Sequence, residues 1–218
     1  MSQQRLKKTA LLLVFFSGGA WAGAQKYEAL ADSVRSQLSK SVADTAVEHA
    51  AFADSAAVQA WLAEMSRRMA RRIPDAEFRN DFLNTLHYEA TRAGLDPELM
   101  LGLIEVESGF KKYAVSDMGA RGFTQVMPFW VKAIGNRDQD LFHLRTNLRY
   151  GATILRHYLD IERGDYFRAL GRYNGSLGRP EYPNAVRAAW RNHWTYGIVS
   201  RSFRPAKQAR AAGDKPGS

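Results

Sequence analysis

Apolar residues recur every three to four positions along most of this chain, which is the spacing of amphipathic helices. Pro74, Gly94 and Gly175 interrupt this spacing, as residues that end helices do. No stretch alternates apolar and polar residues over a useful length, and the sequence contains no internal repeat. The expected fold is therefore mainly α. The predicted helices span residues 58–72, 76–93, 97–107, 147–159, 166–173 and 182–190.

The helix predicted over 97–107 has the clearest boundaries. Asp96 is a suitable N-cap, Pro97 suits the first helical position, and Gly109 follows the last turn. At roughly 100° per residue, Glu107 falls inside the apolar arc of this helix, whereas Glu105 falls on the opposite side. One carboxyl group is thus expected to face the core at a helix end, while its neighbour faces water.

A core-facing carboxyl group such as that of Glu107 has a specific chemical use. Burial disfavours the charged form, which raises the pKa and leaves the group protonated near neutral pH. Cleavage of a glycosidic bond needs such an acid to protonate the leaving oxygen. The helical wheel alone leaves another interpretation open, in which Glu107 makes a structural salt bridge or caps a neighbouring helix.

A polar loop punctuated by glycine follows this helix. Gly119 and Gly122 permit positive φ angles and a close approach of the backbone. Ser116 and Gln125 in the same loop are candidates to line a polar cleft near Glu107. By itself the loop is weak support for a site, because glycines three apart usually mark turns.

Two later residues each have two interpretations. Asn147 opens the helix predicted over 147–159, where it is either an N-cap or part of a site. Tyr173 is either a core aromatic with its hydroxyl at the surface or a functional group.

The first 22 residues have the pattern of a secretory signal peptide. A basic start is followed by the apolar run 10–16 and then by Ala20-Trp21-Ala22. We expect cleavage after Ala22, with Ala24 as the alternative; an uncleaved anchor or a buried core helix are the other interpretations. No later run approaches the ~20 apolar residues of a membrane helix. The mature protein is therefore expected to be periplasmic or secreted, without an integral membrane segment.

Charge and composition refine this organisation. Residues 23–75 are expected to form a helical or partly disordered extension, residues 76–200 the main domain, and residues 201–218 a disordered basic tail. The net charge of +9 includes three cations in the signal peptide and a net four positive charges in the tail, so the main body is close to neutral. This distribution argues against a nucleic-acid partner.

The absence of cysteine excludes disulfides, thiolate metal sites and a lipid anchor on cysteine. The five histidines show no paired ligand spacing, so neither a metal nor a cofactor is expected. They are His49, His87, His143, His157 and His193.

Four sequence blocks together resemble the catalytic domain of the soluble lytic transglycosylases (SLT). They follow the order of that family at suitable spacing, and the resemblance covers about residues 78–194. The blocks are Glu107-Ser108-Gly109-Phe110, Ser116-x-x-Gly119-Ala120-x-Gly122-x-x-Gln125-Val126-Met127-Pro128, Asn147-Leu148-x-x-Gly151-x-x-x-Leu155 and Ala169-x-x-x-Tyr173-Asn174.

The resemblance implies a lysozyme-like helical domain, of the goose-type lysozyme and lytic transglycosylase kind, that acts on the glycan strands of peptidoglycan. Such enzymes cleave the β-1,4 bond between N-acetylmuramic acid and N-acetylglucosamine and leave a 1,6-anhydromuramoyl end. Carried over by position, Glu107 is the single acid and base of the reaction. Asp117 is the nearest acidic candidate for a second role.

The same resemblance assigns further site residues. Ser116 is expected to hydrogen-bond near the N-acetyl or glutamate oxygens, and the hydroxyl of Tyr173 to orient Glu107. We expect four residues to bind substrate, although Asn147 suits an architectural role better. They are Gln125, Met127, Asn147 and Tyr182.

The chain departs from the family pattern in two places. Phe123-Thr124 stands where many members have Leu-Met, which puts one sugar contact in doubt, and Gly175-Ser176 follows Tyr173-Asn174 where many members have a small residue and then glycine. A hydrolytic muramidase and a non-catalytic wall-binding or scaffold protein remain alternative functions. The partners expected are peptidoglycan and proteins of the cell wall or of a secretion machinery, and the chain is expected to be a monomer.

Overall fold

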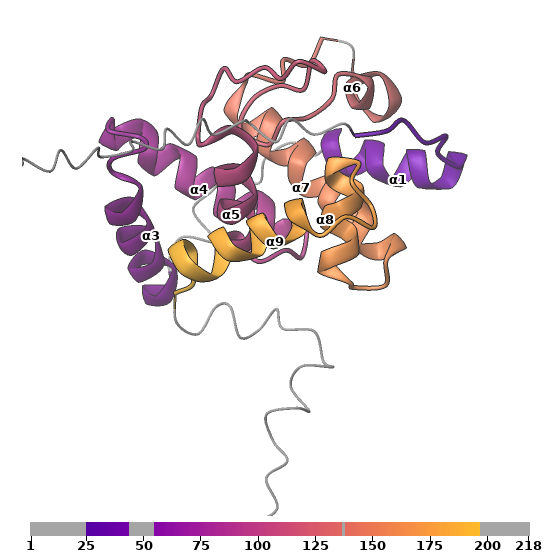
Figure 1. Ribbon diagram of the computed structural model, residues 1–218. Helices are drawn as coiled ribbons and strands as arrows, with labels where there is room; N and C mark the ends of the chain where they lie inside the picture. Colours follow the sequence, from indigo (N-terminus) through magenta and orange to yellow (C-terminus); the bar gives the residue numbers. More distant parts are fainter. Residues whose placement is uncertain (1–24, 44–54, 137, 197–218) are drawn as a thin grey trace, which may run out of the picture.

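The computed structural model describes residues 25–43, 55–136 and 138–196. These residues form helices packed around one core, with α5 near its centre (Figure 1). Within the described ranges, extended pairing is limited to isolated bridges in the loop 115–126. The prediction of a mainly α fold is confirmed. The helices are α1 (Asp32–Ala43), α3 (Ala56–Met69), α4 (Ala76–Arg92), α5 (Pro97–Ser108), α6 (Phe129–Ile134), α7 (Leu144–Ile161), α8 (Tyr166–Asn174), α9 (Glu181–Ala189) and the π-helix η1 (Trp190–Trp194).

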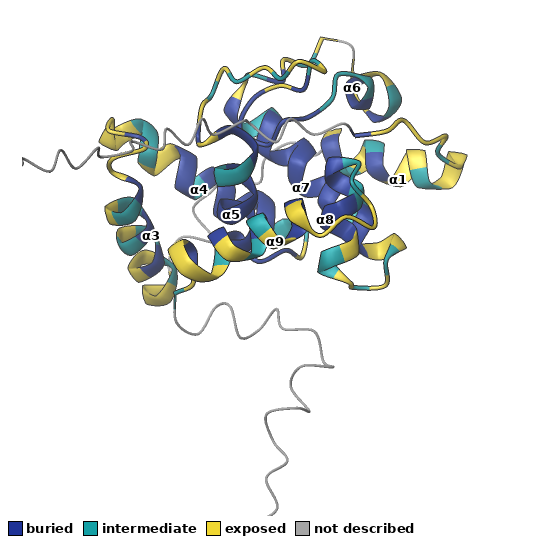
Figure 2. Cartoon of the chain, viewed as in Figure 1, coloured by how far each residue is buried: buried dark blue, intermediate teal, exposed yellow. Residues whose placement is uncertain are grey.

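Helix α5 is buried on nearly all sides, as its dark blue colour in Figure 2 shows. It contacts α4, α9 and η1, and its leucines are fully buried. A side chain at Gly102 would place a Cβ atom 2.8 Å from the backbone nitrogen of Trp190. Glycine at this position therefore lets η1 approach the backbone of α5 closely.

Local signals explain most helix ends. The Asp75 carboxylate accepts a hydrogen bond from the Phe78 N–H at the start of α4, and Asp96 accepts one from the Glu98 N–H at 2.7 Å at the start of α5. Gly109 ends α5 in the left-handed conformation, with φ of 58°. These three ends agree with the predicted boundaries.

The structure differs from the prediction at three elements. Asn147 does not open its helix, because α7 begins at Leu144 with His143 as the N-cap residue. Helix α6 was not predicted, since its six residues are too few to show a helical period. The last apolar stripe continues beyond α9 into η1, which ends at Trp194.

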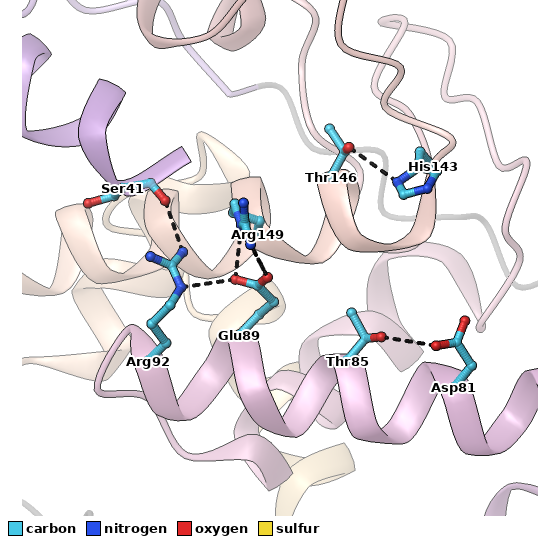
Figure 3. A network of polar contacts seen from close by, with 8 residues as sticks. All are labelled: Ser41, Asp81, Thr85, Glu89, Arg92, His143, Thr146 and Arg149. Carbon is cyan, nitrogen blue, oxygen red and sulfur yellow. Dashed lines mark hydrogen bonds and ion pairs between the residues drawn. The ribbon is translucent and has the colours of Figure 1, made fainter. Parts of the chain in front are cut away.

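A buried ion pair joins α4 to α7 (Figure 3). The Glu89 carboxylate, 1% exposed, accepts a hydrogen bond from Nη2 of Arg149 at 2.9 Å and one from Nε of Arg92 at 3.1 Å. Nη2 of Arg92 also donates to the Ser41 carbonyl oxygen, which links the pair to α1. Removing one member of such a pair leaves an uncompensated buried charge, so the network fixes how these helices pack.

The expectations for the chain ends concern residues outside the described ranges, namely the signal peptide over 1–22 and the tail over 201–218. Among the helices that the structure describes, none is both long and apolar enough to cross a membrane. Helix α1 lies within the predicted N-terminal extension and packs on α6 and α7.

Candidate active site

Glu107 lies in the last turn of α5 and points into the core. The residue is 1% exposed, which agrees with its position in the apolar arc of the helix. Burial raises the pKa of Glu107 from 4.5 to about 8, and the hydrogen bond from Tyr182 acts in the opposite direction. The carboxyl group therefore carries a proton at neutral pH.

Tyr182 on α9 holds the Glu107 carboxyl group. Its hydroxyl donates a hydrogen bond to Oε1 of Glu107 at 2.5 Å, and the tyrosine itself is 1% exposed. The second oxygen, Oε2, is buried and has no hydrogen-bond partner among the described residues. One oxygen is thus held in place while the other has no protein partner in the described ranges, which suits a group that transfers a proton.

Tyr173 does not make the hydrogen bond that would orient Glu107. Its hydroxyl donates to the carbonyl oxygen of Thr124 at 2.7 Å, and Tyr182 makes the bond to Glu107 instead. Tyr173 nevertheless lies close to the site, because the Glu107 charge adds to burial in raising the pKa of Tyr173 well above its usual value. Tyr182, expected to bind substrate, contacts the acid instead.

The polar loop is held together by its own side chains. Oγ of Ser116 accepts a hydrogen bond from the Ala120 N–H at 3.0 Å. The buried side chain of Gln125 donates through Nε2 to the carbonyl oxygens of Gly122, at 2.9 Å, and Ala114, at 3.2 Å. Both predicted site residues thus shape the loop in this structure.

Asn147 is a buried brace rather than a substrate contact. It is fully buried; its Oδ1 accepts from the Thr124 N–H at 2.9 Å, and its Nδ2 donates to the carbonyl oxygens of Arg121 and Leu141. The prediction that it binds substrate conflicts with this geometry, because its amide is already used to fasten the loop to α7. Its architectural role was the better interpretation.

Thr124, where the chain departs from the family pattern, hydrogen-bonds to Asn147. Its hydroxyl lies 2.9 Å from Oδ1 of Asn147 and 3.1 Å from the Asn147 carbonyl oxygen. Phe123 packs against Phe82, with ring centroids 4.9 Å apart. The departure therefore falls in the packing behind the loop.

Glu105 lies on the other face of α5, as the helical wheel indicated, but it is not simply solvated. Its carboxylate accepts hydrogen bonds from Nη2 of Arg72 and Nε1 of Trp194, both at 2.7 Å, and lies 3.0 Å from Nδ1 of His193. These contacts fasten α5 to η1 on the side away from Glu107.

One residue at the site was missed by the sequence analysis. Gln25, which precedes α1, is 5% exposed, and its Oε1 accepts hydrogen bonds from Nε1 of Trp130 at 3.0 Å and from the Met127 N–H at 3.4 Å. Met127 itself is partly buried against the core. No local signal could have found Gln25, because its partners lie about a hundred residues further along the chain.

No metal site emerges from the described residues. No group of three or more histidine, aspartate or glutamate side chains in those ranges is arranged to hold a metal ion.

Comparison with known proteins places the site in a family. Residues 84–189 match the family model "Transglycosylase SLT domain". A transglycosylase of Enterobacteria phage PRD1 is 31% identical over 98 residues, which are 45% of this chain and 36% of the phage protein. A membrane-bound lytic murein transglycosylase C of Actinobacillus pleuropneumoniae serotype 5b is 47% identical over 47 residues, or 22% of this chain and 13% of the relative.

The homologous protein of Glaesserella parasuis, also named membrane-bound lytic murein transglycosylase C, is 34% identical over 99 residues, covering 41% of this chain and 26% of the relative. An inactive mutant of the lytic transglycosylase Slt from Pseudomonas aeruginosa aligns at 23% identity with a TM-score of 0.39, over 55% of this chain and 21% of that one. The chain thus spans between 13% and 36% of the length of these relatives. Over residues 84–189, just under half of its length, this chain is therefore similar to the transglycosylase SLT domain family.

Proposed function

We propose that this chain is a peptidoglycan lytic transglycosylase in which Glu107 acts first as general acid and then as general base. The observation that carries the proposal is the Glu107 carboxyl group itself. It is buried at the end of α5, it has a pKa of about 8, and Tyr182 holds one of its oxygens while the other has no partner in the described part of the chain. A protonated acid at neutral pH is what departure of a glycosidic oxygen requires.

In the first step, the Glu107 proton passes to the glycosidic oxygen as the bond from that oxygen to C1 of the muramoyl residue breaks. The N-acetyl carbonyl oxygen of the same sugar stabilises the positive charge that develops at C1. In the second step, the Glu107 carboxylate takes the proton of the muramoyl C6 hydroxyl while that oxygen bonds to C1. The acid is regenerated, and no water is consumed.

One carboxyl group is sufficient for this sequence of steps. Among the described residues, burial and Tyr182 account for the pKa of Glu107, and no second carboxylate contributes. Asp117 is exposed in the polar loop. The hydrogen bond from Tyr182 favours the carboxylate, so it assists the stage at which Glu107 has given up its proton.

The remaining site residues have supporting roles in the proposal. Tyr182 positions Glu107, and Tyr173 holds the carbonyl group of Thr124 behind it. Ser116, Gln125 and Met127 line the sugar subsites, and the tight packing of their loop supports a fixed cleft wall.

The substrate and the location follow from the same proposal. The glycan strands of peptidoglycan lie outside the cytoplasmic membrane, where the predicted signal peptide would direct the mature chain. The relatives from Actinobacillus and Glaesserella are named membrane-bound murein transglycosylases, which supports the wall as substrate.

Digestion of purified sacculi tests the proposal. We expect the wild-type chain to release muropeptides with 1,6-anhydromuramoyl ends, detected by mass spectrometry. The Glu107→Gln variant should lose at least about a hundredfold in rate, because it keeps the shape but not the acid. Glu77→Gln is the matched control, since Glu77 is exposed in the first turn of α4.

Other products would contradict parts of the proposal. Reducing muramic acid ends would identify a hydrolytic muramidase, with water in place of the C6 hydroxyl. Full activity of Glu107→Gln would refute the role of the acid. Binding to sacculi without release of muropeptides would identify a scaffold protein.

A further inference from the structure

The short segment before α1 packs against the candidate site. We call residues 25–28 the strap. In Figure 1 it begins the indigo trace that runs between α6 and α8 toward α1. Gln25 is buried, whereas the next three residues are exposed, so a single side chain of the strap enters the core.

The Gln25 carboxamide is held by two N–H donors. Its Oε1 accepts from the indole of Trp130 at 3.0 Å and from the Met127 backbone at 3.4 Å. Gln25 also neighbours Tyr173: burial and the charge of Glu107 raise the pKa of Tyr173, and Gln25 acts in the opposite direction. The buried Nε2 of Gln25 has no hydrogen-bond partner among the described residues. The carboxamide therefore lies one side chain away from the acid.

The rest of the strap is held lightly. The ring of Tyr27 meets that of Phe129 edge to face at 5.6 Å between centroids, and the Glu28 carboxylate lies 3.4 Å from Nη1 of Arg172. Among the described residues, no backbone hydrogen bond involves residues 25–28. A segment held by a few side-chain contacts can leave the surface without unfolding a helix.

In this structure the candidate acid cannot be reached by a ligand. Glu107 and Tyr182 are each 1% exposed, and Tyr173 is fully buried. A general acid has to touch the bond that it protonates, so some part of the structure must move before substrate binds. Of the parts that touch the site, α5, α8 and α9 are held by helical hydrogen bonds and the loop 115–126 by several backbone bonds of its own, whereas the strap has none among the described residues.

The group that the strap inserts is chemically specific. A glutamine side chain ends in a primary amide, and the N-acetyl group of a peptidoglycan sugar is likewise an amide with one carbonyl oxygen and an N–H. The same two donors that hold Oε1 of Gln25 suit the carbonyl oxygen of an acetamido group. A bound sugar would then compete with Gln25 for them rather than add to its contacts.

We propose that the strap is an autoinhibitory segment, and that the Gln25 carboxamide occupies the pocket that receives the N-acetyl group of the sugar beside Glu107. This inference rests on the proposed function, because it assumes an N-acetylated glycan as ligand. The wild-type chain binds its substrate only in the fraction of molecules from which the strap has withdrawn.

A binding titration with an N-acetylglucosamine tetramer tests the inference. All proteins carry Glu107→Gln to prevent turnover, and binding is followed by isothermal titration calorimetry. Adding Gln25→Ala should tighten binding about tenfold, the effect of removing two neutral hydrogen bonds that the ligand must displace. Gln37→Ala is the matched control, because Gln37 is exposed on α1, and it should leave the affinity unchanged.

A second variant protects the test against loss of folding in Gln25→Ala. The double substitution Tyr27→Ala and Glu28→Ala removes the outer anchors of the strap and leaves the pocket intact. It should tighten binding in the same direction. Unchanged affinity in both variants overturns the inference, and weaker binding would show instead that Gln25 helps to hold the sugar. Absence of binding in every variant also overturns it.

Steady-state kinetics on sacculi distinguishes failure of this inference from failure of the proposed function. With Glu107 present, Gln25→Ala should lower the KM for sacculi about tenfold and leave kcat unchanged. Loss of cleavage in Glu107→Gln together with an unchanged KM in Gln25→Ala would refute the strap alone. Cleavage that survives Glu107→Gln would refute the proposed function, whatever the titration gives.

Discussion

The buried Glu107 carboxyl group predicts a pH-dependent change in stability that does not depend on any enzymatic assay. In the folded chain its pKa is about 8, against the usual 4.5 when the group is solvated. Between these two values the unfolded chain releases the proton while the folded chain keeps it. The contribution of Glu107 to the free energy of unfolding is therefore largest below pH 4.5 and falls as the pH rises toward 8.

The pKa values set the size of the effect. A rise from 4.5 to about 8, at 1.36 kcal/mol per unit, corresponds to about 5 kcal/mol of stability lost by pH 8, of which about 3 kcal/mol is lost by pH 7. Glu107→Gln removes the ionisation and keeps the shape. The difference in unfolding free energy between variant and wild type should therefore grow in favour of the variant with increasing pH.

Urea unfolding of both proteins at pH 5, 6, 7, 8 and 9 measures this difference. Any constant difference in stability between glutamine and protonated glutamate shifts the free-energy difference equally at every pH. The decisive quantity is therefore the slope of this difference against pH. We expect about 1.4 kcal/mol per pH unit between pH 5 and 8 and a plateau above that. The exposed control Glu77→Gln should show no slope. A difference for Glu107→Gln that is independent of pH would refute the burial argument.

Two further predictions concern neighbouring positions. Tyr182→Phe removes the hydrogen bond that favours the Glu107 carboxylate, so the alkaline limb of the pH–rate profile should move up by about one to two pH units. Tyr173→Phe should leave that limb in place, because the Tyr173 hydroxyl bonds to Thr124. Equal shifts in both variants would contradict the assignment. Gly151→Ala would place a Cβ atom 2.6 Å from the side chain of Thr124, so urea unfolding should show a loss of about 1–3 kcal/mol, and wild-type stability would contradict this packing.

Features that depend on neighbours in the chain could be predicted from the sequence. Asp96 caps α5 and Gly109 ends it because capping and the left-handed conformation are local properties of the residue type. The inward position of Glu107 follows from the same local geometry, since the period of the helix fixes which side chains share a face.

The errors involve contacts between distant segments. Which tyrosine meets Glu107 depends on how α8 and α9 pack against α5, and Tyr182 is 75 positions from its partner. Asn147 had the right residue type for an N-cap, but its amide is used by Thr124, Arg121 and Leu141, which reach it only through the fold.

The sequence by itself determined most of the helices, the family blocks and the one carboxyl group on the apolar side of α5. Only the tertiary structure decided what surrounds that carboxyl group: Tyr182 on one oxygen, no partner in the described residues on the other, and the Gln25 carboxamide one side chain away. The physical reason is that helical periodicity is set by the backbone over a few residues, whereas the pKa of Glu107 is set by burial, which requires segments far apart in the chain to pack together.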